Sequence, residues 1–137
     1  MSVVSEVLRK VHSPELRVSL VWVPALRWDD LEEASRVAAD VRDARVSQYW
    51  DEGGRLAHAL GGVLSIPARE GVADGAPFAW DVYLLYPPGP VFGDRPPAPA
   101  QWLHQLSHLP EGRATWLDAA ALEERLRALT GAEGEAR

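Results

Sequence analysis

The first apolar residues of the chain recur at helical spacing. They share one face of a helix that Ser13-Pro14 would end, and they comprise Val3, Val4, Val7, Leu8 and Val11. Residues Arg17–Val23 have instead the pattern of a strand, with few polar positions on either face. Such strands are usually covered on both sides, so the pattern predicts a sheet between layers of helices.

A second helix is predicted by its capping residues and by its apolar spacing. Asp29 or Asp30 can cap its first turn, and Glu32 or Glu33 stands three residues on as a capping-box partner. The buried stripe of this helix is predicted to consist of Leu31, Ala34, Val37, Ala38 and Val41.

Two further strands are predicted in the middle of the chain. Arg45–Trp50 is the first, and Gly53-Gly54 turns from it into a helix over about 55–60. Residues 66–78 are rich in Gly, Ala, Pro and charge, which predicts a loop. Trp80–Tyr86 has the strongest strand pattern of the whole chain. We therefore expect these two strands and the earlier one to form a single sheet with helices on both faces.

The last third of the chain is predicted to end in helices. Pro87-Pro-Gly-Pro90 stops the preceding strand, and Val91-Phe92 could begin a short returning strand. Two helices follow, roughly Ala100–Leu109 and Trp116–Thr130. Gly131 is expected to stop the second one.

A strand, an aspartate, a glycine turn and a short helix follow one another in the middle of the chain. Asp51, Gly54 and Ala57 form this Asp-x-x-Gly-x-x-Ala pattern, between the run Val46–Trp50 and Gly61. The order resembles the thioredoxin-like superfamily, of the thiol-reductase and peroxiredoxin type. The resemblance implies an α/β, thioredoxin-like three-layer sandwich, incomplete because the family's opening strand is missing; another small α/β sandwich is the alternative.

Length and composition define the domain and exclude several chemistries. We expect one α/β domain over residues 1–131 and a disordered tail over 132–137. The chain has no cysteine, so it has no thiolate for thiol-disulfide exchange, for disulfides or for metal binding. Its net charge of −6 argues against a nucleic-acid partner, because phosphate binding needs a basic surface.

The N-terminus and the apolar runs predict a soluble, cytoplasmic protein with no membrane partner. Met1 to Val11 mixes valine with polar and charged residues, so it lacks the continuous apolar region of a signal peptide. The longest apolar run, near Val18 to Leu26, is too short to span a bilayer.

Two Trp-Asp dipeptides at strand ends are candidates for chemistry. Asp51 follows Trp50, and Asp81 follows Trp80. Two carboxylates near the rim of a sheet could act as acid and base or could bind a cation. In the alternative interpretation Asp51 caps the glycine turn, Asp81 accepts hydrogen bonds from loop amides, and the indoles pack in the core.

His104 and His108 lie four residues apart in the helix predicted over 100–109. On that helix both would lie opposite the apolar stripe that contains Trp102, so we expect them to face solvent. A third ligand is missing nearby in sequence, so we expect no native metal site and no cofactor. Adventitious metal binding or a subunit contact is the alternative role for the pair.

Several aromatic residues lack an obvious place in the core. Trp28 lies in a polar loop beside two aspartates, and an interaction surface could include Trp28, Phe78, Trp80, Phe92 and Trp102. The sequence thus favours a non-catalytic thioredoxin-like module that binds a protein partner or supports assembly. The missing strand and the surplus aromatics also predict a homodimer. The alternative is a small enzyme or ligand-binding protein that uses Asp51, Asp81 and His104.

Overall fold

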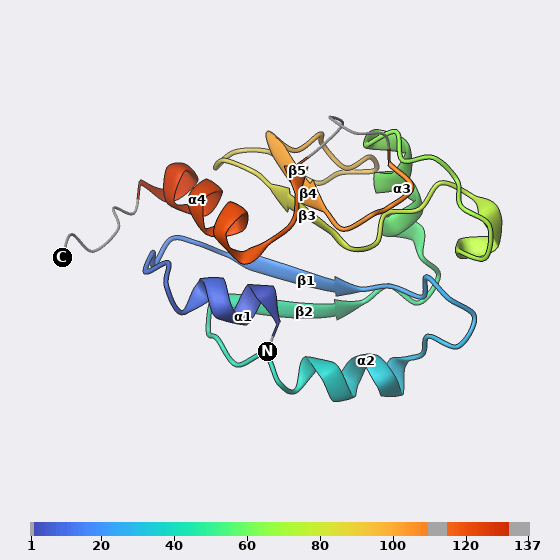
Figure 1. Ribbon diagram of the computed structural model, residues 1–137, viewed down its shortest axis with the longest axis horizontal. Helices are drawn as coiled ribbons and strands as arrows, with labels where there is room; N and C mark the ends of the chain where they lie inside the picture. Colours follow the sequence, from blue (N-terminus) through green and yellow to red (C-terminus); the bar gives the residue numbers. More distant parts are fainter. Residues whose placement is uncertain (1, 110–114, 132–137) are drawn as a thin grey trace.

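Helices and strands alternate along the part of the chain that the structure, a computed structural model, describes: residues 2–109 and 115–131 (Figure 1). This part is a mixed α/β fold with four α-helices and two small sheets. The elements are α1 (Val3–Leu8), β1 (Val18–Trp22), α2 (Leu31–Ala38), β2 (Val46–Trp50), α3 (Arg55–Val63), the 3-10 turn η1 (Ala73–Gly75), β3 (Val82–Leu85), β4 (Gln101–His104), β5 (Thr115–Trp116) and α4 (Ala119–Thr130). The predicted tail over 132–137 lies outside the described residues.

The strands form two separate hydrogen-bonded sheets. β1 and β2 pair in parallel, from Val18 opposite Val46 to Trp22 opposite Trp50. β3 pairs antiparallel with β4, and β4 pairs in parallel with β5. The prediction of one sheet from the first three strands is therefore wrong, because β3 takes β4 as its hydrogen-bonding neighbour.

The predicted helix over Ala100–Leu109 is also wrong. Gln101–His104 is a strand, and Leu103 and Trp102 of this strand contribute to cores on opposite sides of the sheet. A short apolar run suits either a strand or a helix, and pairing with β3 decides for the strand here. The following helix starts later than predicted because Thr115–Trp116 joins β4. The sequence predicts a cap by Thr115 with Asp118 as its partner, whereas Asp118 itself is the N-cap; the Gly131 stop is confirmed.

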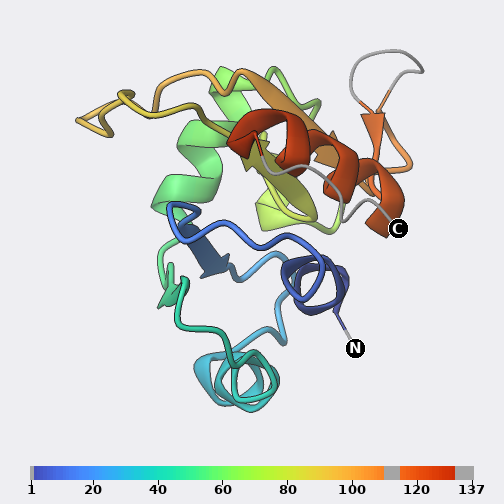
Figure 2. The ribbon, with the colours of Figure 1, turned by 90° about the vertical axis from the view of Figure 1, so that its left-hand side faces the viewer.

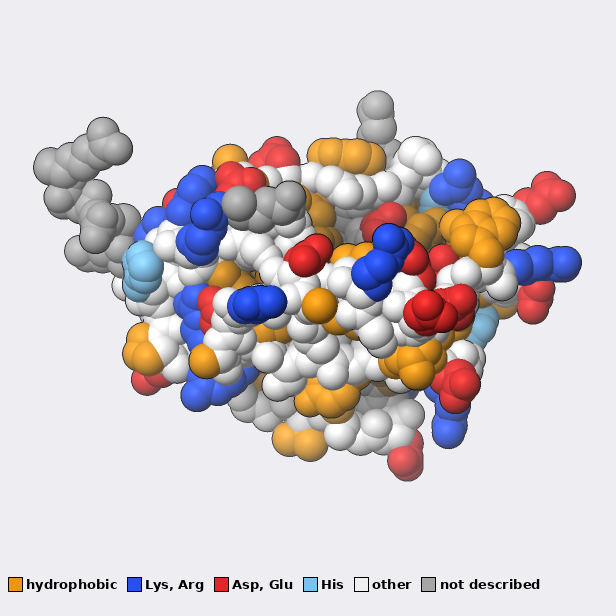
Figure 3. Space-filling model, turned by 90° about the horizontal axis from the view of Figure 1, so that it is seen from below, with side chains coloured by type: hydrophobic (Ala, Val, Ile, Leu, Met, Phe, Trp, Pro, Cys, Tyr) orange, Lys and Arg blue, Asp and Glu red, His pale blue; other side chains and the backbone are white. Residues whose placement is uncertain are grey.

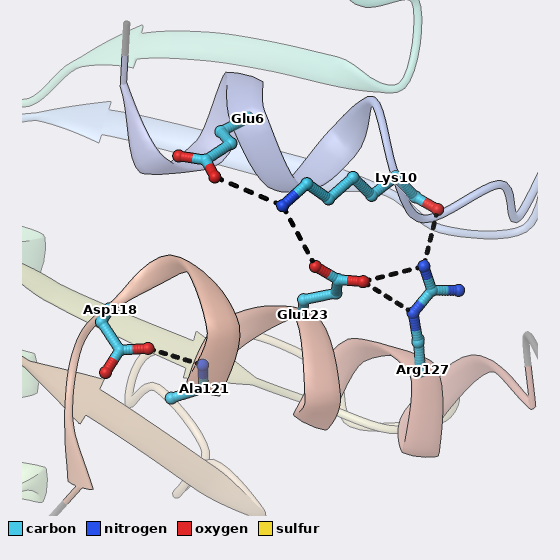
Figure 4. Close-up of polar contacts among 6 residues, drawn as sticks. All are labelled: Glu6, Lys10, Asp118, Ala121, Glu123 and Arg127. Atoms are coloured by element: carbon cyan, nitrogen blue, oxygen red, sulfur yellow. Dashed lines mark hydrogen bonds and ion pairs between the residues drawn. The ribbon is translucent and has the colours of Figure 1, made fainter. Parts of the chain in front are cut away.

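The largest core lies between the first and last helices and the strands beside them. α1 packs against α4, and the buried residues are Val4, Val7, Leu8, Val11, Leu16, Leu85, Leu103, Leu117, Leu122 and Leu126. A polar network links the two helices at the surface (Figure 4). Lys10 Nζ contacts both Glu6 and Glu123, and Arg127 bonds Glu123 and the Lys10 carbonyl oxygen. Hydrogen bonding from Arg127 lowers the pKa of Glu123.

The opposite side of the β3–β4 pair is covered by α3 and the segment before β3. Phe78 is buried there, close to two glycines of the α3 region. A Cβ at Gly61 would stand 2.6 Å from the Phe78 backbone nitrogen, and one at Gly54 would stand 2.8 Å from the Phe78 ring. Gly54 also has a φ of +64°, so the turn itself favours glycine there.

Helix α2 buries less apolar surface than the sequence predicts. Asp30 caps it as predicted, through a 2.9 Å bond from the Glu33 amide, but none of its residues is buried. The predicted buried stripe is thus wrong: Leu31 and Val37 are among the exposed large hydrophobics. Figure 2 shows the reason, since α2 lies at one end of the molecule beyond a sheet of only two strands.

Strand β1 is likewise less covered than its apolar pattern predicts. Val18 and Leu20 pack against the α1–α4 core, whereas Ser19 is exposed and Val21 is half-buried. Seen from the side of α2, the surface carries hydrophobic side chains in separate patches among charged ones (Figure 3). The expected cover on both faces of β1 is therefore incomplete.

Arg45 holds the start of β2 against the end of α1. Its guanidinium donates to the carbonyl oxygens of Leu8 and Val11, each at 2.6 Å, and pairs with Asp43 at 2.7 Å. The hydrogen bonds that Asp43 accepts from Arg45 lower the pKa of the Asp43 carboxyl group to about 2. The cation also lies where the carbonyl groups at the end of α1 attract positive charge.

The predicted returning strand at Val91-Phe92 does not form. Both residues are exposed in the non-regular segment between β3 and β4, where the Phe92 ring contacts the Tyr86 ring edge-on. Across the described ranges, no helix has the length and apolar character needed to cross a membrane.

Candidate partner-binding site

A tight turn after β1 places Trp28 at the surface. The Asp29 carboxylate accepts a 2.8 Å bond from the Leu26 amide, and the Asp29 amide donates to the Leu26 carbonyl oxygen at 3.1 Å. These reciprocal bonds leave Arg27 and Trp28 at the tip of the turn, and Asp30 then caps α2. Trp28 is 76% exposed, which is unusual for the largest apolar side chain.

A pocket of about 320 Å³ lies beside this turn. It is lined by the post-β1 residues Pro24, Ala25, Leu26, Arg27 and Asp29 and by Gly71, Ala73 and Asp74 of the segment before β3. The Ala73 amide donates to the Ala25 carbonyl oxygen at 3.0 Å and so joins the two segments. The pocket therefore lies beside the loop that follows the carboxyl end of β1.

The pocket wall contains strained backbone. Ala73 and Asp74 have φ values of 45° and 55°, in the left-handed region that costs a non-glycine residue on the order of 1 kcal/mol. Strain of this kind persists only where the surroundings enforce it, and it gathers at binding sites. Here Val72 is buried in the same cluster as Phe78, and Ala73 packs against that cluster.

The predicted aromatic surface is divided by the structure. Trp28 and Phe92 are exposed, on different loops. Phe78 is buried, so its assignment to an interaction surface is wrong, while Trp80 and Trp102 are half-buried and pack around the α3 core. Of the predicted set, Trp28 alone adjoins the pocket in sequence.

Asp51 works as a helix cap. Its carboxylate accepts bonds from the backbone amides of Arg55, Leu56 and Ala57, at 3.0, 3.0 and 3.1 Å. These amide donors take three of the about four acceptor positions of the carboxylate. The capping interpretation of Asp51 is therefore confirmed.

Asp81 lies at the entry to β3 with a φ of 50°. Burial raises the pKa of its carboxyl group, and burial together with the Asp81 charge raises the pKa of Tyr83. The backbone oxygen of Asp81 accepts a 3.1 Å bond from the Gln105 amide, which ties the residue to the end of β4. Asp81 as a whole residue is nevertheless exposed, so its carboxyl group is only partly shielded from water.

His104 is buried, contrary to the predicted exposure. It is 5% exposed, its Nδ1 accepts a 3.0 Å bond from the Leu106 amide, and its ring contacts those of Trp102 and Trp116. His108 instead stacks on Trp80 and bonds the Pro67 oxygen. The helical geometry that paired the two histidines is absent, and within residues 2–109 and 115–131 no cluster of three or more metal-binding side chains occurs.

Sequence reasoning missed Arg27, the lining segment 71–74 and two exposed aromatics, Tyr49 and Trp116. Tyr49 alternates with half-buried residues of β2, so the period of a strand could have indicated its exposure. The pocket had no comparable signal, because it is built from segments far apart in the chain. Comparison of the chain with protein-family models, curated proteins and solved structures found no match.

Proposed function

We propose that this protein is a non-catalytic, thioredoxin-like α/β module that binds a protein partner through Trp28 and the adjoining pocket. Because the chain lacks cysteine, the module carries no thiol redox activity. The order of β1, α2, β2 and α3 along the chain, with β1 and β2 parallel, supports the thioredoxin-like assignment.

The exposure of Trp28 is the observation that carries the proposal. A tryptophan in water gives up a large apolar contribution to stability, and tryptophan is enriched among the residues that dominate protein interfaces. The turn from Leu26 to Asp29 holds the residue on a fixed backbone, so little ordering is needed when a partner binds.

The enzyme alternative finds less support from the same side chains. The Asp51 carboxylate accepts hydrogen bonds from three backbone amides. The His104 ring accepts a hydrogen bond from the Leu106 amide and contacts two indole rings. Asp81 has a raised pKa, but it is tied to β4 rather than to the pocket.

A displayed library of random peptides, selected on the immobilised protein, tests the proposal. Selected peptides should bind Trp28→Ala at least about 30-fold more weakly than the parent, corresponding to the roughly 2 kcal/mol of a hot-spot residue. Trp116→Ala is the matched control, because Trp116 is 52% exposed and lies on β5. Equal binding to the parent and to Trp28→Ala, or failure to select any peptide, would contradict the proposal.

We also propose that the protein is a homodimer. Several apolar side chains stay in contact with water, among them Leu31, Val37 and Tyr49. A closed two-fold assembly is the commonest way in which one chain covers such residues.

A further inference from the structure

The outer edge of β2 presents unpaired backbone groups. The Val18 amide donates to the Arg45 oxygen and the Asp51 amide donates to the Trp22 oxygen, so the odd-numbered residues of β2 point toward β1. The backbone groups of Gln48 and Trp50 therefore point away from β1. In the part of the chain that the structure covers, no hydrogen bond satisfies them on that side. Such a row of donors and acceptors is a template for another strand.

The usual protection of an edge strand is missing from β2. Its five residues, Val46–Trp50, include no charge and no proline. Tyr49 is 56% exposed on one face of the strand. Natural proteins normally protect such an edge with lysine, proline or a covering segment, so an unprotected edge indicates a surface that another chain covers.

We infer that β2 pairs antiparallel with β2 of a second copy, about a two-fold axis at Gln48. In this register Val46 lies opposite Trp50 and Ser47 lies opposite Tyr49, each pair twice. Gln48 of each copy exchanges both backbone bonds with its counterpart, and the Trp50 amide donates to the Val46 oxygen across the axis. The Val46 amide is already bonded to the Asp43 oxygen at 3.0 Å. The result is a continuous four-stranded sheet in which each aromatic residue of β2 lies opposite a smaller residue, with no like charges among the paired residues.

Helix α2 adds apolar surface close to the same axis. The side-chain nitrogen Nε2 of Gln48 donates to the Ala38 oxygen at 3.0 Å, so the end of α2 lies over the middle of β2. Val37, next to Ala38, is 41% exposed. Two five-residue strands alone bury less than the roughly 1,000 Å² that a stable interface needs, and the paired ends of α2 supply further area.

The β2 interface rests on the proposed homodimer, and two measurements test the homodimer and the interface separately. Light scattering should give twice the 15.0 kDa chain mass. Because the chain has no cysteine, introduced thiols report contacts without background. Ser47→Cys and Tyr49→Cys change two exposed side chains that the register brings face to face, about 4.5 Å apart between Cα atoms and within reach of a disulfide.

Mixed under mild oxidation, the two cysteine variants should form a disulfide-linked dimer that either variant alone does not form. Each variant alone is the matched control, since its own two cysteines are out of register. Monomer mass at every concentration would refute both the homodimer and the interface. A dimer mass without the 47–49 crosslink, or with equal crosslinking of single variants, would refute the β2 interface and leave the homodimer standing.

Discussion

Gly61→Ala and Gly62→Ala are neighbouring substitutions in α3 that we expect to have opposite effects on stability. A Cβ at Gly61 meets the Phe78 nitrogen at 2.6 Å and the Pro77 carbonyl carbon at 2.7 Å, whereas a Cβ at Gly62 meets nothing within 4 Å. Both contacts at Gly61 are with backbone, which cannot rotate away as a side chain can. The two variants share the same helix, so their difference isolates the packing of α3 against the segment before β3.

The magnitudes follow from two opposing terms. Alanine in place of glycine within a helix stabilises by about 0.5–1 kcal/mol, in both variants. Overpacking at Gly61 costs about 1–3 kcal/mol, because Pro77 and Phe78 must move away from the helix. We therefore expect Gly62→Ala to raise the free energy of unfolding slightly, and Gly61→Ala to fall about 2 kcal/mol below it. At about 4 °C per kcal/mol, the melting temperatures should differ by about 8 °C.

Urea denaturation followed by tryptophan fluorescence, together with thermal melting by circular dichroism, measures this difference. Equal slopes of the urea transition would show that the unfolded states are comparable. Because Phe78 supports the pocket segment through Val72, Gly61→Ala should also weaken any peptide selected on the pocket. Gly61→Ala as stable as Gly62→Ala would show that the approach of α3 to Phe78 is looser than described.

Two further predictions concern the core and the charged surface. Leu85→Asp should abolish soluble, cooperatively melting protein, because Leu85 is buried and an unpaired buried charge costs several kcal/mol, a large part of a domain's stability. Leu84→Asp, at a half-buried position, should still fold, with a lower melting temperature. Asp43→Asn should lower the free energy of unfolding at pH 7, since the folded-state pKa of Asp43 is about 2, below the ordinary 3.8. The difference in unfolding free energy between the parent and the variant should shrink as pH falls from about 4 toward 2. A difference that is constant across that range would contradict the role of the pair with Arg45.

The features that could be predicted from sequence are those with local causes. Asp30 and Asp51 accept bonds from amides three to six residues ahead, so the starts of α2 and α3 could be predicted from the chain itself. Asp118 caps α4 in the same local way, but the predicted helix began at Trp116, before this cap. Gly131, with a φ of +66°, ends α4 for an equally local reason. Trp28 stood out because no apolar spacing included it.

The features that could not be predicted depend on partners far along the chain. β4 is a strand because its backbone pairs with Val82–Leu85 of β3. The residues Gln101–His104 alone suit a strand and a helix equally. The pocket requires the bond from Ala73 to Ala25, between segments about fifty residues apart. His104 was placed on the wrong surface for the same reason, since its burial follows from the pairing of β4.

The contact between α1 and α4 also determines when the chain can complete its fold during synthesis. α1 is made long before α4, yet its apolar face packs against residues such as Leu122 and Leu126, and Arg127 bonds the Lys10 oxygen across 117 residues. A nascent chain therefore carries α1 without its contact to α4 until the residues of α4 have been translated. Contacts between residues so far apart in sequence form slowly, so we expect the exposed apolar face of α1 to be bound by chaperones that hold apolar segments.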